Sequence, residues 1–196
     1  MRRHSMKFLL VSIAMVALSA PALSFASGDV AAGKARASGA CLSCHGMDGI
    51  GRNERWPNIA GQNDLYLIKQ MNDFRAGTRK DSYMTPMARP LTDQNIRDIA
   101  AYYASLPGDH VSPPGIGNPL AGREKAAACV ECHGADGHSP DREWPNLAGQ
   151  KPDYLIKQMR KFRDGIRHNP LMSPVAATLS NEDINDLAAW FAALKP

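Results

Sequence analysis

Apolar and polar residues follow a helical period in several parts of the chain, most clearly in residues 92–106. Ile96, Ile99 and Tyr103 recur there at intervals of three and four residues, which places them on one face of a helix. Thr92 suits the N-cap position because its hydroxyl can accept a hydrogen bond from the first turn. No stretch of the sequence alternates convincingly enough to form a strand. The pattern therefore predicts an all-α fold.

Two further helices are expected ahead of this one. The first runs from about Asp29 to the cysteine pair that begins at Cys41. The second begins near Asn63 and ends near Ala76, where Gly77 can take the left-handed conformation that is common after a helix. The first half of the chain is thus expected to fold from three main helices.

The second half of the chain repeats the first at an offset of 88 residues, without a gap from the first cysteine of each copy to the C-terminus. Ser180 and Asp183 stand at the spacing of a capping box for the last helix. There are two copies, each of about 80 residues, which indicates a duplicated domain rather than a solenoid. The matching segments include Trp56-Pro57-Asn58 with Trp144-Pro145-Asn146, Tyr66–Met71 with Tyr154–Met159, and Met84-Thr85-Pro86 with Met172-Ser173-Pro174.

Composition divides the chain into four segments. Residues 1–26 have the pattern of a signal peptide: a basic start, an apolar run over Phe8–Leu18 and a small-x-small cleavage site at the end. Residues 27–107 and 117–196 are the two copies, joined by a linker over residues 108–116 that is rich in Pro and Gly. The signal predicts export to the periplasm. An uncleaved membrane anchor is the alternative, although the apolar run is short for a membrane span.

The charge balance gives no support for a nucleic-acid partner. The chain has 23 basic and 19 acidic side chains, and three of the basic ones lie in residues 1–26. Residues 27–196 then hold 20 basic and 19 acidic side chains, a formal charge of +1. The sequence has no basic stripe, so we expect no binding to nucleic acid.

All four cysteines of the chain lie in two copies of the motif Cys-x-x-Cys-His. The motif is typical of covalent haem attachment, in which both thiols add to the porphyrin vinyl groups and the histidine binds the iron. A zinc site or a redox disulfide also uses paired cysteines, but neither explains a histidine after both pairs. We predict two covalently bound haem c groups. They are attached through Cys41, Cys44, Cys129 and Cys132, with His45 and His133 as axial ligands.

A methionine is expected to supply the second axial ligand of each iron. The histidines outside the two motifs do not match across the repeat, whereas two pairs of methionines do. Met84 and Met172 lie in a Pro-containing loop before the last helix, each 39 residues after its histidine, and are the favoured pair. Met71 and Met159 lie on an apolar helix face, where core packing is more usual, and are the alternative. Met87 is set aside because its counterpart is a valine.

Two prolines are expected to orient the iron-binding histidines. Pro57 and Pro145 each follow their histidine by 12 residues. A metal-bound histidine usually donates its free ring N–H to an acceptor, and a proline offers a carbonyl with no N–H of its own. We predict that these two carbonyls accept from His45 and His133. A purely structural role in a rigid loop is the alternative.

Two pairs of aromatic residues are expected near the haem groups. Trp56 and Trp144 either line the haem pockets or pack in the core. Tyr66 and Tyr154 place a hydroxyl on an apolar helix face, from which we expect it to reach a haem propionate.

Together these motifs resemble the cytochrome c4 family, over essentially all of residues 28–196. The resemblance is carried by both Cys-x-x-Cys-His motifs, the Trp-Pro-Asn-[Ile/Leu]-Ala-Gly-Gln segment, Met-x-Pro before a capped helix and the closing Ala-Ala-Tyr-Tyr-Ala pattern. Trp190-Phe191 replaces Tyr102-Tyr103 in the second copy, which keeps the site apolar. The resemblance implies two tandem class I cytochrome c domains about a pseudo-two-fold axis, with the propionate edges of the haems facing each other.

The same resemblance implies axial ligation by His45 with Met84 and by His133 with Met172. Members of the family carry electrons between respiratory complexes. The implied acceptor is a terminal haem–copper oxidase of the cbb3 type, and the implied donor is a quinol-oxidising complex or a dehydrogenase. The resemblance also allows a peripheral association with the membrane.

The expected ligands favour electron transfer over catalysis. Histidine with methionine fills both axial positions of the iron and raises its potential, so no position is left for peroxide or oxygen. A dihaem peroxidase needs an open or displaceable ligand, and a thiosulfate dehydrogenase of the familiar type needs a spare cysteine that the chain lacks. A haem subunit docked permanently to a periplasmic dehydrogenase has the same ligands and remains an alternative.

Overall fold

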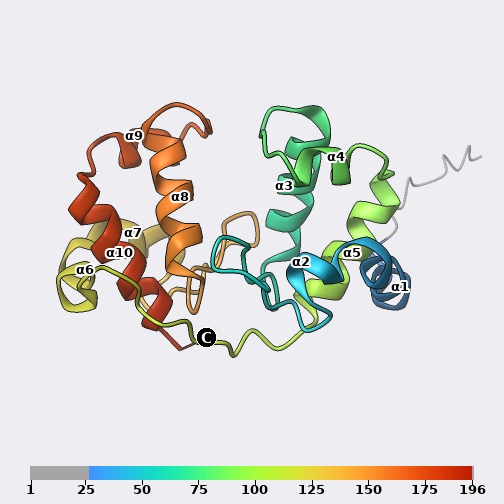
Figure 1. Cartoon of the computed structure of the whole chain (residues 1–196), viewed down its shortest axis with the longest axis horizontal. Helices are drawn as coiled ribbons and strands as arrows, with labels where there is room; N and C mark the ends of the chain where they lie inside the picture. The colour runs from blue at the N-terminus through green and yellow to red at the C-terminus, as the bar shows by residue number, and fades with distance from the viewer. Residues whose placement is uncertain (1–26, 196) are drawn as a thin grey trace, which may run out of the picture.

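The computed structural model describes residues 27–195, and within that range it contains ten α-helices and no strand (Figure 1). The all-α prediction is confirmed, whereas the predicted signal peptide over residues 1–26 lies outside the described residues. The helices are α1 (Val30–Ala40), α2 (Leu42–His45), α3 (Asp64–Ala76), α4 (Met84–Ala88), α5 (Asp93–Ala104), α6 (Pro119–Lys125), α7 (Ala127–His133), α8 (Pro152–Arg163), α9 (Met172–Ala177) and α10 (Asn181–Ala193).

The helices form two halves that lie side by side. Figure 1 shows α1–α5 on one side and α6–α10 on the other, with α3 and α8 facing each other at the centre. In the first half α5 packs against α1 and α3, and in the second half α10 packs against α6 and α8 in the same way. The prediction of two tandem domains from one duplicated sequence is thus confirmed.

The helix starts expected from the sequence are present as capped ends. Asp29 accepts hydrogen bonds from the first turn of α1, at 2.8 Å from the nitrogen of Ala31. Thr92 forms a capping box with Asn95 at the start of α5, and Ser180 forms the corresponding box at the start of α10. Gly77 ends α3 in the left-handed conformation, with φ of 77°. These local hydrogen bonds fix where each helix begins and ends.

The two segments that carry Met84 and Met172 are short helices, not the loops that the sequence predicts. The side chain of Asp81 accepts from the nitrogen of Met84 at 3.3 Å, and Asn169 accepts from that of Met172 at 2.9 Å. These hydrogen bonds satisfy the backbone N–H of the first residue of α4 and of α9. Pro86 lies in the first turn of α4, where a helix needs no donor from it.

Close packing of the outer helices depends on two glycines. A Cβ atom on Gly33 would lie 2.0 Å from the carbonyl oxygen of Asp98, and one on Gly122 would lie 2.0 Å from that of Asp186. No side chain fits at either position, so the glycines let α1 approach α5 and α6 approach α10. Cys41, directly after α1, and Cys129, on α7 directly after α6, pack against cores that include residues of α5 and α10.

The two halves are joined by a symmetric set of hydrogen bonds between their loops. The side chain of Gln150 accepts from the nitrogen of Asn58 at 2.9 Å and donates to its carbonyl at 2.8 Å. Gln62 makes the same pair of bonds with the backbone of Asn146, at 2.8 and 2.9 Å. The linker is tied down as well, because Ser112 donates its hydroxyl to Gly149 at 2.8 Å. The halves therefore share one ordered interface.

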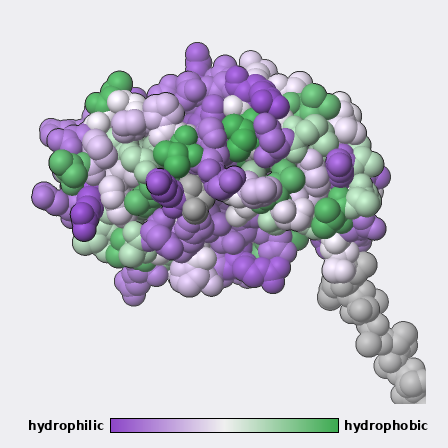
Figure 2. Space-filling model, turned by 90° about the horizontal axis from the view of Figure 1, so that it is seen from below, coloured by the Kyte–Doolittle hydropathy of each residue, from purple (hydrophilic) through white to green (hydrophobic). Residues whose placement is uncertain are grey.

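The face seen in Figure 2 mixes polar and apolar side chains, and the apolar ones are scattered. Among the described residues, no helix is both long and apolar enough to cross a membrane.

Candidate haem sites

The first cysteine pair lies where α1 gives way to α2. Cys41 donates its backbone N–H to Ala37 at 3.1 Å, and His45 donates to Cys41 at 2.9 Å, so a single turn carries both cysteines and the histidine. Both thiols are free and half-buried. Burial raises the pKa of Cys41, and the neighbouring Cys44 adds to the effect. Two free thiols on one turn beside a histidine suit attachment of one haem.

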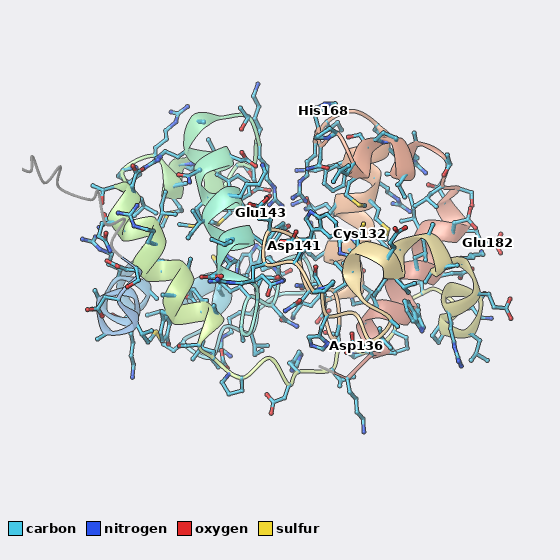
Figure 3. The ribbon with its side chains drawn as sticks, turned by 180° about the vertical axis from the view of Figure 1, so that it is seen from behind. Cys132, Asp136, Asp141, Glu143, His168 and Glu182 are labelled. Carbon is cyan, nitrogen blue, oxygen red and sulfur yellow. The ribbon has the colours of Figure 1, made fainter. Side chains whose placement is uncertain are left out.

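The second pair has the same construction on α7, where Figure 3 labels Cys132. Burial likewise raises the pKa of Cys129, with a smaller contribution from Cys132. Within residues 27–195, no three or more His, Cys, Asp or Glu side chains gather as a set of metal ligands. The two cysteine pairs therefore serve separate sites, one in each half.

Both motif histidines are buried and contact the proline carbonyl expected from the sequence. Nδ1 of His45 lies 3.1 Å from the carbonyl oxygen of Pro57, and Nδ1 of His133 lies 3.0 Å from that of Pro145. Burial lowers the pKa of both histidines, and the hydrogen bond only partly offsets it. With Nδ1 donating to the carbonyl, the ring is neutral and its Nε2 lone pair is available for a metal.

The two candidate methionine pairs lie in different surroundings. Met84 and Met172 are half-buried at the first residue of α4 and α9. Met71 and Met159 pack against the apolar core of their own half. Met87 is 41% exposed. The packing of the helix pair agrees with the sequence argument, and the assignment of Met84 and Met172 to the iron stays a prediction.

The four aromatic residues expected near the haem groups differ in their contacts. Trp56 is half-buried and meets Tyr83 edge to face, with ring centroids 6.4 Å apart. The carbonyl of Trp144 accepts from the side chain of Asn63 in the other half at 2.8 Å. Tyr66 and Tyr154 each receive a hydrogen bond from an arginine of the opposite half, at 3.3 and 3.0 Å. The tyrosines thus belong to the interface between the halves.

Those two arginines are residues that the sequence reasoning missed. Arg79 and Arg167 are only 8% and 9% exposed. They match across the repeat at the same offset of 88 residues, and so do their hydrogen-bond partners Gln70 and Gln158. The repeat itself was the signal that could have found them. Sequence reasoning passes over them because an arginine outside a motif is usually solvated.

The side chains present fit two covalently held haem groups. Each half offers two free thiols for attachment, a neutral histidine held by a carbonyl, and an apolar core that includes the first cysteine of its motif. A small helical domain with this attachment turn is the architecture of a class I cytochrome c, and the chain contains it twice. The fold and the sites together define a dihaem cytochrome c.

Comparison with known proteins gives the family. A model of the family described as Cytochrome c matches residues 30–107, and one described as Cytochrome C oxidase, cbb3-type, subunit III matches residues 113–191. Cytochrome c4 of Pseudomonas aeruginosa is 38% identical over 202 residues, covering 96% of this chain and 100% of that protein. A thiosulfate dehydrogenase electron acceptor of Stutzerimonas stutzeri is 34% identical over 168 residues, 78% of each chain.

The crystal structure of reduced recombinant cytochrome c4 from Pseudomonas stutzeri superimposes with a TM-score of 0.77 at 35% identity, covering 86% of this chain and 100% of that one. The chain therefore belongs to the cytochrome c4 family. It is a dihaem electron carrier and not an enzyme, and its two haem c groups occupy the sites built on Cys41, Cys44 and His45 and on Cys129, Cys132 and His133.

Proposed function

We propose that this protein is a periplasmic carrier that takes electrons from a respiratory donor complex to a terminal haem–copper oxidase of the cbb3 type. The observation that carries the proposal is the pair of equivalent haem sites in one rigidly joined chain, because one site can accept an electron while the other donates. The match of residues 113–191 to a family named for a cbb3-type oxidase subunit supports this acceptor.

Four side chains are proposed as the axial ligands: His45 with Met84, and His133 with Met172. Bound haem supplies one-electron redox chemistry. The chain sets its properties, since the carbonyls of Pro57 and Pro145 hold each imidazole by Nδ1 and a thioether ligand raises the potential. With both axial positions filled by side chains, the protein passes electrons without binding oxygen.

The location and the domain limits belong to the same proposal. Residues 1–26 act as an export signal, and the mature protein consists of domains over residues 27–107 and 117–196 with a linker over residues 108–116. Cytochromes of the c type are ligated to their haem outside the cytoplasm, which supports the periplasmic location. Peripheral association with the membrane would place the carrier next to its partners.

A second candidate function is that of an electron acceptor for a periplasmic dehydrogenase. The observation that favours it is the 34% identity to a protein named as the electron acceptor of thiosulfate dehydrogenase. Both candidate functions use the same haem sites. They differ in the partner protein with which electron transfer is fastest.

Turnover with purified partners separates these functions. Reduced protein is mixed with a cbb3-type oxidase, and oxygen consumption is followed together with loss of the reduced haem band. The proposal predicts reoxidation over many turnovers that saturates with protein concentration. Oxidase alone and oxidised protein without reductant are the controls. Failure of reoxidation, with rapid reduction by a thiosulfate dehydrogenase, would instead assign the protein to the dehydrogenase.

A further inference from the structure

A buried polar cluster lies between α3 and α8, where the two halves meet. Its members are Arg79, Gln70 and Tyr66 from the first half and Arg167, Gln158 and Tyr154 from the second. The arginines and glutamines are each less than 10% exposed. Every member matches a member of the other half at the repeat offset, so the cluster has the symmetry of the whole molecule.

The hydrogen bonds of the cluster are crossed between the halves. Arg79 donates to Gln70 of its own half at 2.6 Å, and to Tyr154 and Gln158 of the other half at 3.0 Å each. Arg167 repeats the arrangement, with Gln158 at 2.9 Å, Gln70 at 2.6 Å and Tyr66 at 3.3 Å. The amide oxygen of each glutamine therefore accepts from both arginines, and neither arginine serves one half alone.

The chain places one carboxylate near this cluster, that of Asp81, which acts on Arg79 without forming an ion pair with it. In the part of the chain that the structure describes, the ion pairs within 4.0 Å include none with Arg79 or Arg167. Asp81 pairs instead with Lys157 at 3.3 Å and lies 3.9 Å from Lys161. The pKa of Lys161 is lowered by burial and, to a smaller extent, by the charges of Lys157, Arg79 and Arg167. The guanidinium groups also lie over aromatic rings, Arg79 at 4.4 Å from the centroid of Phe74 and Arg167 at 4.3 Å from that of Phe162.

The helices that carry the cluster also contact the haem attachment sites. One face of α3 packs through Leu67 and Met71 in the apolar core that includes Cys41, while Tyr66 and Gln70 on the adjacent face belong to the cluster. On α8, Met159 packs in the core that includes Cys129, and Gln158 next to it belongs to the cluster. Each of these two helices thus contacts both the arginine cluster and the core that includes a haem-attachment cysteine.

A positive charge in a poorly screened interior stabilises an iron that gains an electron. We propose that Arg79 and Arg167 form one shared electrostatic element that raises the potentials of both haems, so that each haem is tuned by an arginine of the opposite domain as well as by its own. Arginines of both halves act on Tyr66: burial alone would raise the pKa of this tyrosine, yet Arg167 and Arg79 together bring it below its ordinary value.

The proposal rests on the two bound haems, and it is tested by optical redox titration of the intact dihaem protein. Arg79→Gln and Arg167→Gln remove one charge each and keep a hydrogen-bonding side chain. Both midpoint potentials are expected to fall in each variant, by similar amounts, and further in the double variant. Arg79→Lys keeps the charge and is expected to leave both potentials near their original values. The haem methyl signals in the NMR spectrum of the oxidised protein assign each potential to its domain.

Gln62→Ala is the matched control, because it removes hydrogen bonds between the halves without a change in charge. Its potentials should match those of the unmodified protein. A fall in the potential of one haem only would show that each arginine serves its own domain. Unchanged potentials in both glutamine variants, or an equal fall in Gln62→Ala, would show a structural role. Any of these results overturns the proposal, whereas a variant spectrum without two haems per chain would count against the haem sites themselves.

Discussion

A proline carbonyl holds each iron-binding histidine at a fixed tautomer. The Nδ1 atoms of His45 and His133 lie 3.1 and 3.0 Å from the carbonyls of Pro57 and Pro145. The carbonyl accepts the ring hydrogen, and burial keeps the imidazole neutral, so the other nitrogen points its lone pair at the metal. The same pairing in both halves means that each haem site is oriented by its own loop.

Substitution of the proposed methionine ligands gives a direct spectroscopic result. An Fe–S(Met) bond produces a weak charge-transfer band at the red edge of the oxidised spectrum. Met84→His and Met172→His should each remove about half of this band, because one of two equivalent bonds is lost. Met87→His, at an exposed position in the same short helix, is the control and should leave the band intact. A full band in both ligand variants would redirect the assignment to Met71 and Met159.

Single residues also show where sequence reasoning works and where it stops. The attachment cysteines and their histidines are predictable because the chemistry fixes their spacing. The contact from Pro57 to His45 is predictable because the repeat pairs it with Pro145. The repeat pairs Arg79 with Arg167 and so marks both, but their burial could not be predicted, because it depends on side chains of the other half that no local pattern connects with them.

The helices of each half are set by caps and by close packing of small residues. The capping side chains of Thr92 and Ser180 are predicted from the sequence, and the structure has them in those roles. Asp29, expected only as the start of the first helix, is also its N-cap. The sequence predicts loops at Met84 and Met172, because a proline two residues later argues against a helix interior. The acceptors at Asp81 and Asn169 start a helix there, and proline is tolerated in a first turn.

An ion-pair network joins α6 to α10 and makes the stability of the second half depend on pH. Lys125 lies 2.7 Å from Asp186 and 2.9 Å from Asp183. The hydrogen bond from Lys125 is the largest cause of the lowered pKa of Asp186. A lowered pKa in the folded state stabilises the fold above the unfolded value of about 3.9, and that stabilisation is lost as the pH falls through the folded value.

Lys125→Met should therefore lower the free energy of unfolding most at neutral pH, and the difference from the unmodified protein should shrink below about pH 4. Urea unfolding of the holoprotein, followed by circular dichroism at pH 7 and at pH 3, measures this difference. Lys34→Met on the exposed side of α1 is the control and should have little effect at either pH. A difference for Lys125→Met that is the same at both values would contradict the linkage.

The whole molecule is a pair of equivalent domains locked together by polar contacts. Gln150 bonds to the backbone of Asn58, and Gln62 bonds to that of Asn146, so the two halves exchange matching hydrogen bonds. The duplication and the domain count could be predicted from the sequence, because the repeat is nearly complete. The interface could not, because its residues are amides and arginines that a sequence pattern assigns to solvent.

An optical redox titration of the mature protein tests the central claim, that one chain holds two haems with histidine and methionine ligands and carries electrons. The claim predicts absorbance equal to two haem c groups per chain, and two one-electron steps at the raised potentials typical of this ligation. One haem per chain, or a step at the low potential of a haem without a methionine ligand, would contradict it.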